Sequence, residues 1–369
     1  MITRHIGVEI FADGEDVTAN LSPFLQSISY TDNSGGEADT AEIELEDTEH
    51  LFMGEWLPRR GLSVSITLFR ENWLGDGQIE TFPLGSFELD EMEISYPPSV
   101  ARIKLNSIAQ NSGLRQRDES HAWENVKLSQ IARDVADKAK VKLVYDTPED
   151  PTIKRAEQSE VSALAFLEKL CADNGLALKV SDGTLIIFDE TKLEAQEPVA
   201  QLIFGASTIK RFSATATLQE IYKRCEVVYK HGQKDEKIIG SFDDAGKDDG
   251  KTLKINQRVE SQAEAEKLAK KKLRDKNKKE VQIRLTTTGR FELVAGNVVE
   301  LVNHGMFSGR YLIEKSTHRV GGDANIARRE ERRGHESQSA LHDCGVESHA
   351  NNQTACKRLK RINDFKRRA

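Results

Sequence analysis

Alternation of apolar and polar residues is the feature that most constrains how this chain folds. Within residues 1–112, short runs place an apolar residue at every second position, and glycine-containing turns separate the runs. Side chains of a strand point alternately to two faces, so each run predicts a strand with one buried face. Such runs hold Ile6, Val8 and Ile10; Ala41, Ile43 and Leu45; Leu62, Val64, Ile66 and Leu68; and Ala101, Ile103 and Leu105. Several short strands without a helix predict a small β-barrel or a β-sandwich.

Helical spacing replaces alternation in the next segment. Apolar residues recur every three or four positions over 128–139, which predicts an amphipathic helix. A second apolar stripe follows Ser159 and Ser162, either of which can cap a helix. Two strand-like runs then flank Ser181-Asp182-Gly183 and predict a hairpin. These features predict an α+β domain over residues 113–197.

The late segment returns to alternation. Ser261-Gln262-Ala263-Glu264 is a capping box that predicts a helix near 261–276. Alternating apolar residues follow in the run 281–285. Residues 198–320 are therefore predicted to form a second β-barrel domain that carries this helix. The expected fold class is α+β, mainly β, with the α+β domain inserted between two barrels.

The last segment, residues 321–369, differs from the rest in composition. It has no alternating run, no Trp and no Tyr, and it ends in a basic run. We expect a disordered basic tail. Its five candidate zinc ligands match no tight ligand spacing, so a solvated tail is the simpler interpretation. These candidates are His335, His342, Cys344, His349 and Cys356.

Catalytic signatures are missing from the sequence. It contains no nucleophile elbow, phosphate-binding loop or zinc-protease motif. The acidic run 243–250 lacks the ligand pattern of a calcium loop. Cys171 lies on an apolar helical stripe, which predicts a core thiol, and His318 has no partner at a recognisable spacing. We therefore expect no enzyme activity, no cofactor and no metal.

Charge and hydropathy limit the partners. The formal net charge is −7, and the basic tail leaves the body more acidic still. Nucleic-acid-binding surfaces need clustered Lys and Arg, so specific DNA binding is disfavoured. No apolar run approaches the ~20 residues of a membrane span, and no secretory leader is recognisable at the N-terminus. With only four cysteines, the composition favours synthesis in a reducing cytoplasm.

Three blocks of the sequence resemble the phage late control D family. Residues 36–47 followed by Trp56-Leu57-Pro58 resemble the first barrel of these proteins. Residues 158–185 are similar to their α+β insertion, and residues 261–319 to their second barrel. Together the blocks extend the resemblance over residues 1–320. The chain departs from the family after His318, where members continue into a further short strand.

The resemblance implies a function as well as a fold. Members are baseplate hub proteins of contractile phage tails and are related to the N-terminal part of VgrG spikes. It implies a homotrimer in which three pairs of tube-like barrels join the six-fold tail tube to the three-fold spike. The implied partners are the tail tube protein, the central spike protein and other baseplate proteins, with DNA passing through unbound. The implied location is the virion tail baseplate, assembled in the bacterial cytoplasm.

Other functions stay open at this point. The same architecture suits the hub of a type VI secretion system or of a pyocin-like particle. A hub with cell-wall hydrolase activity would need paired catalytic carboxylates, which the sequence does not show. A wall-binding module built on residues 113–190 is a third class.

Glu42, Glu44 and Glu46 are the candidate functional residues. They alternate with the apolar residues of the run 41–45, so they share the face opposite to the core. Burying three carboxylates without partners is costly, so that face must meet water, cations or a wet channel. A solvated outer face is the simpler interpretation. The resemblance favours a face that lines a channel or a subunit interface, and an acidic wall would repel DNA.

Overall fold

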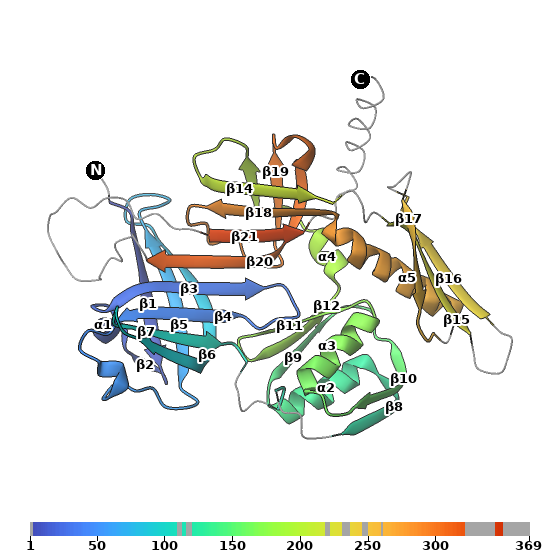
Figure 1. Cartoon of the computed structure of the whole chain (residues 1–369), viewed down its shortest axis with the longest axis horizontal. Helices are drawn as coiled ribbons and strands as arrows, with labels where there is room; N and C mark the ends of the chain where they lie inside the picture. The colour runs from blue at the N-terminus through green and yellow to red at the C-terminus, as the bar shows by residue number, and fades with distance from the viewer. Residues whose placement is uncertain are drawn as a thin grey trace.

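The computed structural model describes residues 3–108, 113–115, 120–217, 222–230, 237–245, 250–259, 261–321 and 344–349. Strands predominate, and the longer helices come from the middle and late parts of the chain (Figure 1). The predicted fold class, mainly-β α+β, is therefore confirmed. The described strands do not close into separate barrels, however, but build one large sheet and three small ones.

The first half of the large sheet comes from the N-terminal segment. Its strands are β1 (His5–Ala12), β3 (Leu25–Asn33), β4 (Thr40–Glu46), β5 (Ser63–Glu71), β6 (Ile79–Ser95) and β7 (Val100–Asn106). They lie in the order β3-β4-β7-β6-β5-β1, with the short β2 (Glu15–Asp16) beside β1. Helix α1 (Thr18–Leu21) and a 3-10 turn (Leu51–Met53) complete the segment. The long strand β6 pairs with β5 through its first part and with β7 through its second.

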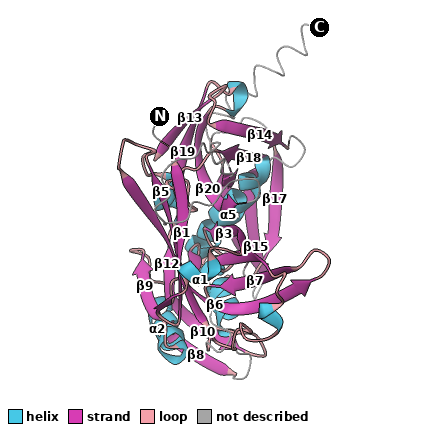
Figure 2. Ribbon diagram, turned by 90° about the vertical axis from the view of Figure 1, so that its left-hand side faces the viewer, coloured by secondary structure: helices cyan, strands magenta, loops and turns pink. Residues whose placement is uncertain are grey.

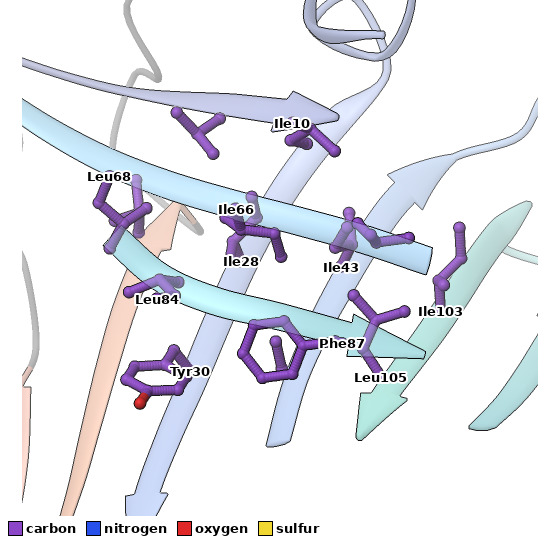
Figure 3. Close-up of a cluster of buried hydrophobic side chains, with 14 of the residues drawn as sticks. Ile10, Ile28, Tyr30, Ile43, Ile66, Leu68, Leu84, Phe87, Ile103 and Leu105 are labelled. Atoms are coloured by element: carbon purple, nitrogen blue, oxygen red, sulfur yellow. The ribbon is translucent and has the colours of Figure 1, made fainter. Parts of the chain in front are cut away.

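The alternating apolar residues of this half form its core. Side chains from β3, β4 and β7 point towards those from β1 and β5, as Figure 3 shows for Ile28, Ile43 and Leu105 opposite Ile10 and Ile66. All five are almost completely buried. The period of two in the sequence thus selected the correct face of each strand.

The second half of the large sheet comes from the late segment and from residues 344–349. Its strands are β13 (Ala200–Ile203), β14 (Ile209–Ala216), β18 (Val281–Thr287), β19 (Val298–Val302), β20 (Gly309–Gly321) and β21 (Cys344–His349). They lie in the order β14-β18-β21-β20-β19-β13. A 3-10 turn (Gly305–Phe307) connects β19 to β20.

The two halves are joined directly through their backbones. Strands β3 and β20 pair in antiparallel register from Lys315 opposite Asn33 to Gly321 opposite Ser27, and they run side by side in Figure 1. Gly321 has a φ of +105°, and a Cβ there would lie 2.2 Å from the carbonyl oxygen of Gln26, so the close approach requires glycine. The segments predicted as separate barrels therefore share one continuous sheet.

The two halves also repeat each other strand by strand. Strands β1, β3, β4, β5, β6 and β7 have the same order in the chain and in the sheet as β13, β14, β18, β19, β20 and β21. The register shifts of the ladders correspond as well. The shift after Leu25 in β3 corresponds to that after Ile209 in β14, and the shift after Leu89 in β6 to that after Ile313 in β20. One pair differs: β1 is antiparallel to β5, whereas β13 is parallel to β19.

An α+β unit follows the first half. Its elements are β8 (His121–Lys127), α2 (Leu128–Ala139), β9 (Lys142–Asp146), β10 (Thr152–Gln158), α3 (Ala163–Asp173), β11 (Ala177–Ser181), β12 (Thr184–Phe188) and α4 (Glu190–Glu194). The predicted helix over 128–139 and the predicted hairpin, β11–β12, are confirmed. Of the two candidate caps, Ser162 caps α3 by accepting from the Ala165 amide. In Figure 2 this unit and the second half of the sheet lie at opposite ends of the molecule.

A second small unit interrupts the repeat between β14 and β18. It consists of β15 (Tyr222–Lys230), β16 (Lys237–Asp243), β17 (Lys251–Asn256) and α5 (Gln262–Asn277), followed by a 3-10 turn (Lys278–Glu280). Ser261 caps α5 by accepting from the Glu264 amide, so the predicted capping box begins the helix near 261–276. The helix packs on β15 and β16 around Cys225, Val227 and Leu268.

The tail prediction needs a correction. Residues 344–349 form β21, which pairs with both β18 and β20 and occupies the gap between them. A gap in a sheet exposes unpaired backbone groups on both sides, and a strand of any sequence can satisfy them. The prediction of disorder is therefore wrong for these six residues, and the other tail residues after 321 lie outside the described residues.

Candidate interaction face

The side of the large sheet opposite to its apolar cores carries polar side chains; we call it the polar face. It extends over β14, β18, the second part of β20, β3, β4, β7 and the second part of β6. Strand alternation places these side chains there, because their neighbours in sequence point into the cores. Its charged members are Arg211, Arg284, Lys315, Arg319, Glu42, Glu44, Glu46, Arg102, Lys104, Glu91 and Glu93.

Glu44 is held by a cation of the same chain. Its carboxylate lies 3.1 Å from the guanidinium of Arg102 on β7 and accepts a hydrogen bond of 3.0 Å from the Ser27 hydroxyl on β3. Arg102 also lies 3.8 Å from Glu93 on β6. Glu44 is only 18% exposed, so its charge is compensated within the sheet.

Glu42 stands one row further along the same sheet. It faces Ser29 on β3 and Lys104 on β7, and Lys104 donates to Glu91 at 3.0 Å. The carboxylate of Glu91, with smaller contributions from its neighbours Glu93 and Glu42, raises the pKa of the Lys104 ammonium. The third carboxylate, Glu46, is exposed at the end of β4.

The structure thus places the three predicted glutamates on one face, but among cations. Sequence reasoning missed Arg102 and Lys104, although both alternate with the apolar residues of the run 101–105. That alternation shows that they share a face; only the pairing of β4 with β7 shows that they stand opposite Glu44 and Glu42. The face that was expected to be acidic therefore carries charges of both signs.

A buried ion cluster links the large sheet to the α+β unit. Lys179 on β11 forms an ion pair with Asp32 on β3 and lies 3.6 Å from Asp39. Asp32 also accepts a hydrogen bond of 2.8 Å from the amide of Ala295 in the second half. Burial raises the pKa of Asp39 to about 6, while the Lys179 charge opposes the rise. Three segments distant in sequence meet at this cluster.

A serine and a histidine also meet in the interior, which sequence spacing did not reveal. The Ser316 hydroxyl and His318 Nε2 are 3.1 Å apart on β20, and both bind the carbonyl of Leu293. His318 packs against the rings of Tyr30 and Phe82. Ser316 is fully buried and burial lowers the pKa of His318, so the pair has no access to a substrate and serves the core.

Other features of the described residues offer little for chemistry. A cavity of about 240 Å³ in the first half is lined by apolar side chains and Asn20, without a titratable group. Burial raises the pKa of the Cys171 thiol to about 12, as expected for a core residue. No cluster of three or more metal-ligating side chains is found among the described residues. None of the helices described is long and apolar enough to cross a membrane.

The tail candidates cannot be placed as a site. His335, His342 and Cys356 lie outside the described residues, as do residues 246–249 of the acidic run. For Cys344 and His349 the structure describes the backbone, within β21.

The sequence profile of the phage tail baseplate hub family, GPD, matches residues 109–324. The chain belongs to this family. Two curated relatives support the same assignment: the probable baseplate hub proteins of Escherichia phage 186 and Escherichia phage P2. The first is 30% identical over 175 residues, which are 47% of this chain and 42% of that protein. The second is 30% identical over 178 residues, 48% of this chain and 43% of that protein. The matches thus span less than half the length of these hub proteins.

Solved structures share the fold of this GPD chain. The tail protein from Neisseria meningitidis MC58 has a TM-score of 0.67 at 12% identity, with 96% of this chain and 99% of that chain covered. The 43 kDa tail protein of prophage MuSo2 from Shewanella oneidensis has a TM-score of 0.68 at 13% identity, with 95% and 99% covered. A chain of the Francisella PdpA-VgrG complex has a TM-score of 0.55 at 10% identity, with 95% and 58% covered.

Proposed function

We propose that this chain is the structural hub of a contractile phage tail baseplate and works as a homotrimer. The observation that carries the proposal is the internal repeat of the large sheet. Because each copy contains two similar halves, three copies in a ring present six similar surfaces to a six-fold tail tube. The same ring keeps three-fold symmetry for a spike on its other side. Each half then corresponds to one tube-like barrel element of the ring.

The polar face is the surface we assign to the wall of the central channel. Its described side chains are mostly polar or charged in both halves, as a conduit for DNA requires. Two of its cations are held beside carboxylates, Arg102 at Glu44 and Lys104 at Glu91. Paired cations offer phosphate a weaker attraction than a basic cluster would. DNA therefore passes without specific binding, and the hub itself needs no catalytic residue.

The partners follow from the symmetry. The proposed neighbours are the tail tube protein, the central spike protein and other baseplate proteins, within a virion assembled in the host cytoplasm. The fold alone also suits a secretion hub, since a VgrG-complex chain shares it. We favour the phage tail because both 30% identical relatives are phage hub proteins.

Two added lysines per channel strand test the channel assignment. Particles whose hub carries Glu42→Lys and Glu46→Lys should assemble normally. Their DNA ejection should be at least about tenfold slower, because phosphate then adsorbs to the channel wall, and higher salt should restore the rate. Glu44 is kept, since a lysine there would oppose Arg102.

Glu15→Lys with Glu55→Lys is the matched control. It makes the same charge change at exposed residues away from the polar face and should leave ejection unchanged. Particles of the first variant that assemble and eject normally would contradict the channel assignment.

A further inference from the structure

The large sheet ends in two strand edges that lack a partner within the described part of the chain. Among the described strands, β14 pairs with β18 alone. Strand β6 pairs with β7 from Glu88 to Ser95. Its other side still pairs with β5 at Glu88, but from Glu91 to Ser95 no described strand lies there. Unpaired edges of this length template pairing with another strand.

The internal repeat indicates which strand each free edge can pair with. By strand order and register shift, the second part of β6 corresponds to that of β20, and β14 corresponds to β3. Their counterparts β20 and β3 are paired with each other, in antiparallel register, inside the same chain. We call the β20–β3 pairing the internal joint. It is a template for the same pairing between β6 of one copy and β14 of the next.

Burial supports this correspondence. At the internal joint, the inward side chains of Ser316, His318 and Val320 on β20 are at most 3% exposed. The corresponding residues are Met92 and Ile94 on β6 and Tyr96 directly after this strand; the first two are half-buried, and Tyr96 is 75% exposed.

The other edge shows the same contrast. Ile28 and Tyr30 on β3 are buried at the internal joint. Their counterparts on β14, Phe212 and Ala214, are only half-buried. The two free edges therefore carry apolar side chains that a partner strand would cover.

We propose that copies of this chain join by antiparallel pairing of β6 with β14 of the next copy, in the register of the internal joint. The register follows by transferring each pair of the β20–β3 ladder. Arg319 opposite Ser29 becomes Ser95 opposite Ser213 of the next copy, and Thr317 opposite Thr31 becomes Glu93 opposite Thr215. This head-to-tail contact closes into a ring when three copies are joined, so the inference rests on the proposed homotrimer.

Cysteine pairs at predicted partners test this register. In the full-length chain, with the two tail cysteines changed to serine, the in-register pairs are Ser95→Cys with Ser213→Cys, and Glu93→Cys with Thr215→Cys. The out-of-register pairs exchange the partners: Ser95→Cys with Thr215→Cys, and Glu93→Cys with Ser213→Cys. All four positions are at least partly exposed, and Ser→Cys is nearly isosteric, so folding should be kept. Mild oxidation followed by non-reducing electrophoresis reports covalent dimers and trimers, and light scattering reports the mass without oxidation.

We expect the in-register pairs to cross-link at least about tenfold faster than the exchanged pairs, because neighbouring residues of one strand face lie about 7 Å apart and a disulfide tolerates little stretch. Equal rates, or faster linking of the exchanged pairs, in a chain that still has the mass of a trimer would overturn the register and leave the trimer standing. A monomer mass for the uncrosslinked chain, both alone and with the spike protein present, would overturn the proposed homotrimer and this joint with it.

Discussion

Replacing Lys179 by methionine is expected to lower the free energy of unfolding by about 3–5 kcal/mol at pH 7. The ammonium is the cation that Asp32 and Asp39 share, and their side chains are only 6% and 1% exposed. Methionine fills a similar volume but leaves two carboxylates in a region of low dielectric. Urea unfolding followed by tryptophan fluorescence measures the effect. Lys104→Met, which removes a cation that is 40% exposed, is the control and should lower the free energy of unfolding far less, because water screens its ion pair.

The loss of stability in Lys179→Met should also depend on pH, and the titration of Asp39 decides whether it grows or shrinks as the pH rises. Burial holds the pKa of this carboxyl at about 6 in the folded chain, above its ordinary value of 3.8. A carboxyl whose pKa is higher in the folded than in the unfolded chain stabilises the folded state fully at pH values below its unfolded-state pKa. This contribution to stability is lost as the pH rises through the folded-state pKa. Removing Lys179 raises the pKa of Asp39 further. The deficit of the variant should therefore be small near pH 4 and grow towards pH 7; a deficit independent of pH would contradict this account of the cluster.

Replacing Gly240 by alanine should destabilise the chain by about 3 kcal/mol or more. Gly240 lies on β16 beneath α5, and an added Cβ would stand 2.4 Å from the backbone carbon and the Cβ of Ala265 and from the Glu266 amide. A helix backbone cannot yield locally, so α5 must shift away from its sheet and lose contact with Cys225 and Val227. Thermal unfolding and hydrogen exchange of the α5 amides measure the loss.

Gly75→Ala is the matched control. An added Cβ there meets the far end of the flexible Gln78 side chain at 3.2 Å, which can rotate away. Its stability should change by less than about 1 kcal/mol. Equal stability of the Gly240 variant and the parent chain would show that α5 does not rest on β16 as closely as the structure has it.

Periodicity and capping predicted the individual elements well. The alternation of Ala41, Ile43 and Leu45 gave the buried face of β4, and Ser261 marked the start of α5. These signals are local: a strand's buried face and a helix's first turn depend on residues close in sequence.

The alternation of apolar and polar residues does not predict which distant strands pair with each other. Nothing near His318 indicates that β20 lies beside β3, about 290 residues earlier in the chain, and the same limit hid Lys179 as the partner of Asp32. The register also decided the candidate face, because it alone brings Arg102 to Glu44. The repeat of the two halves is likewise visible in register shifts and strand order rather than in recurring residues.

The mass of the full-length chain in solution tests the central claim most directly. At about 50 µM, where an interface of moderate affinity is saturated, light scattering should give a mass of about 124 kDa, three times the 41.3 kDa of one chain. The measurement is made with and without the proposed spike protein. A trimer mass in either condition agrees with the proposed ring; a stable mass of 41.3 kDa in both would contradict it.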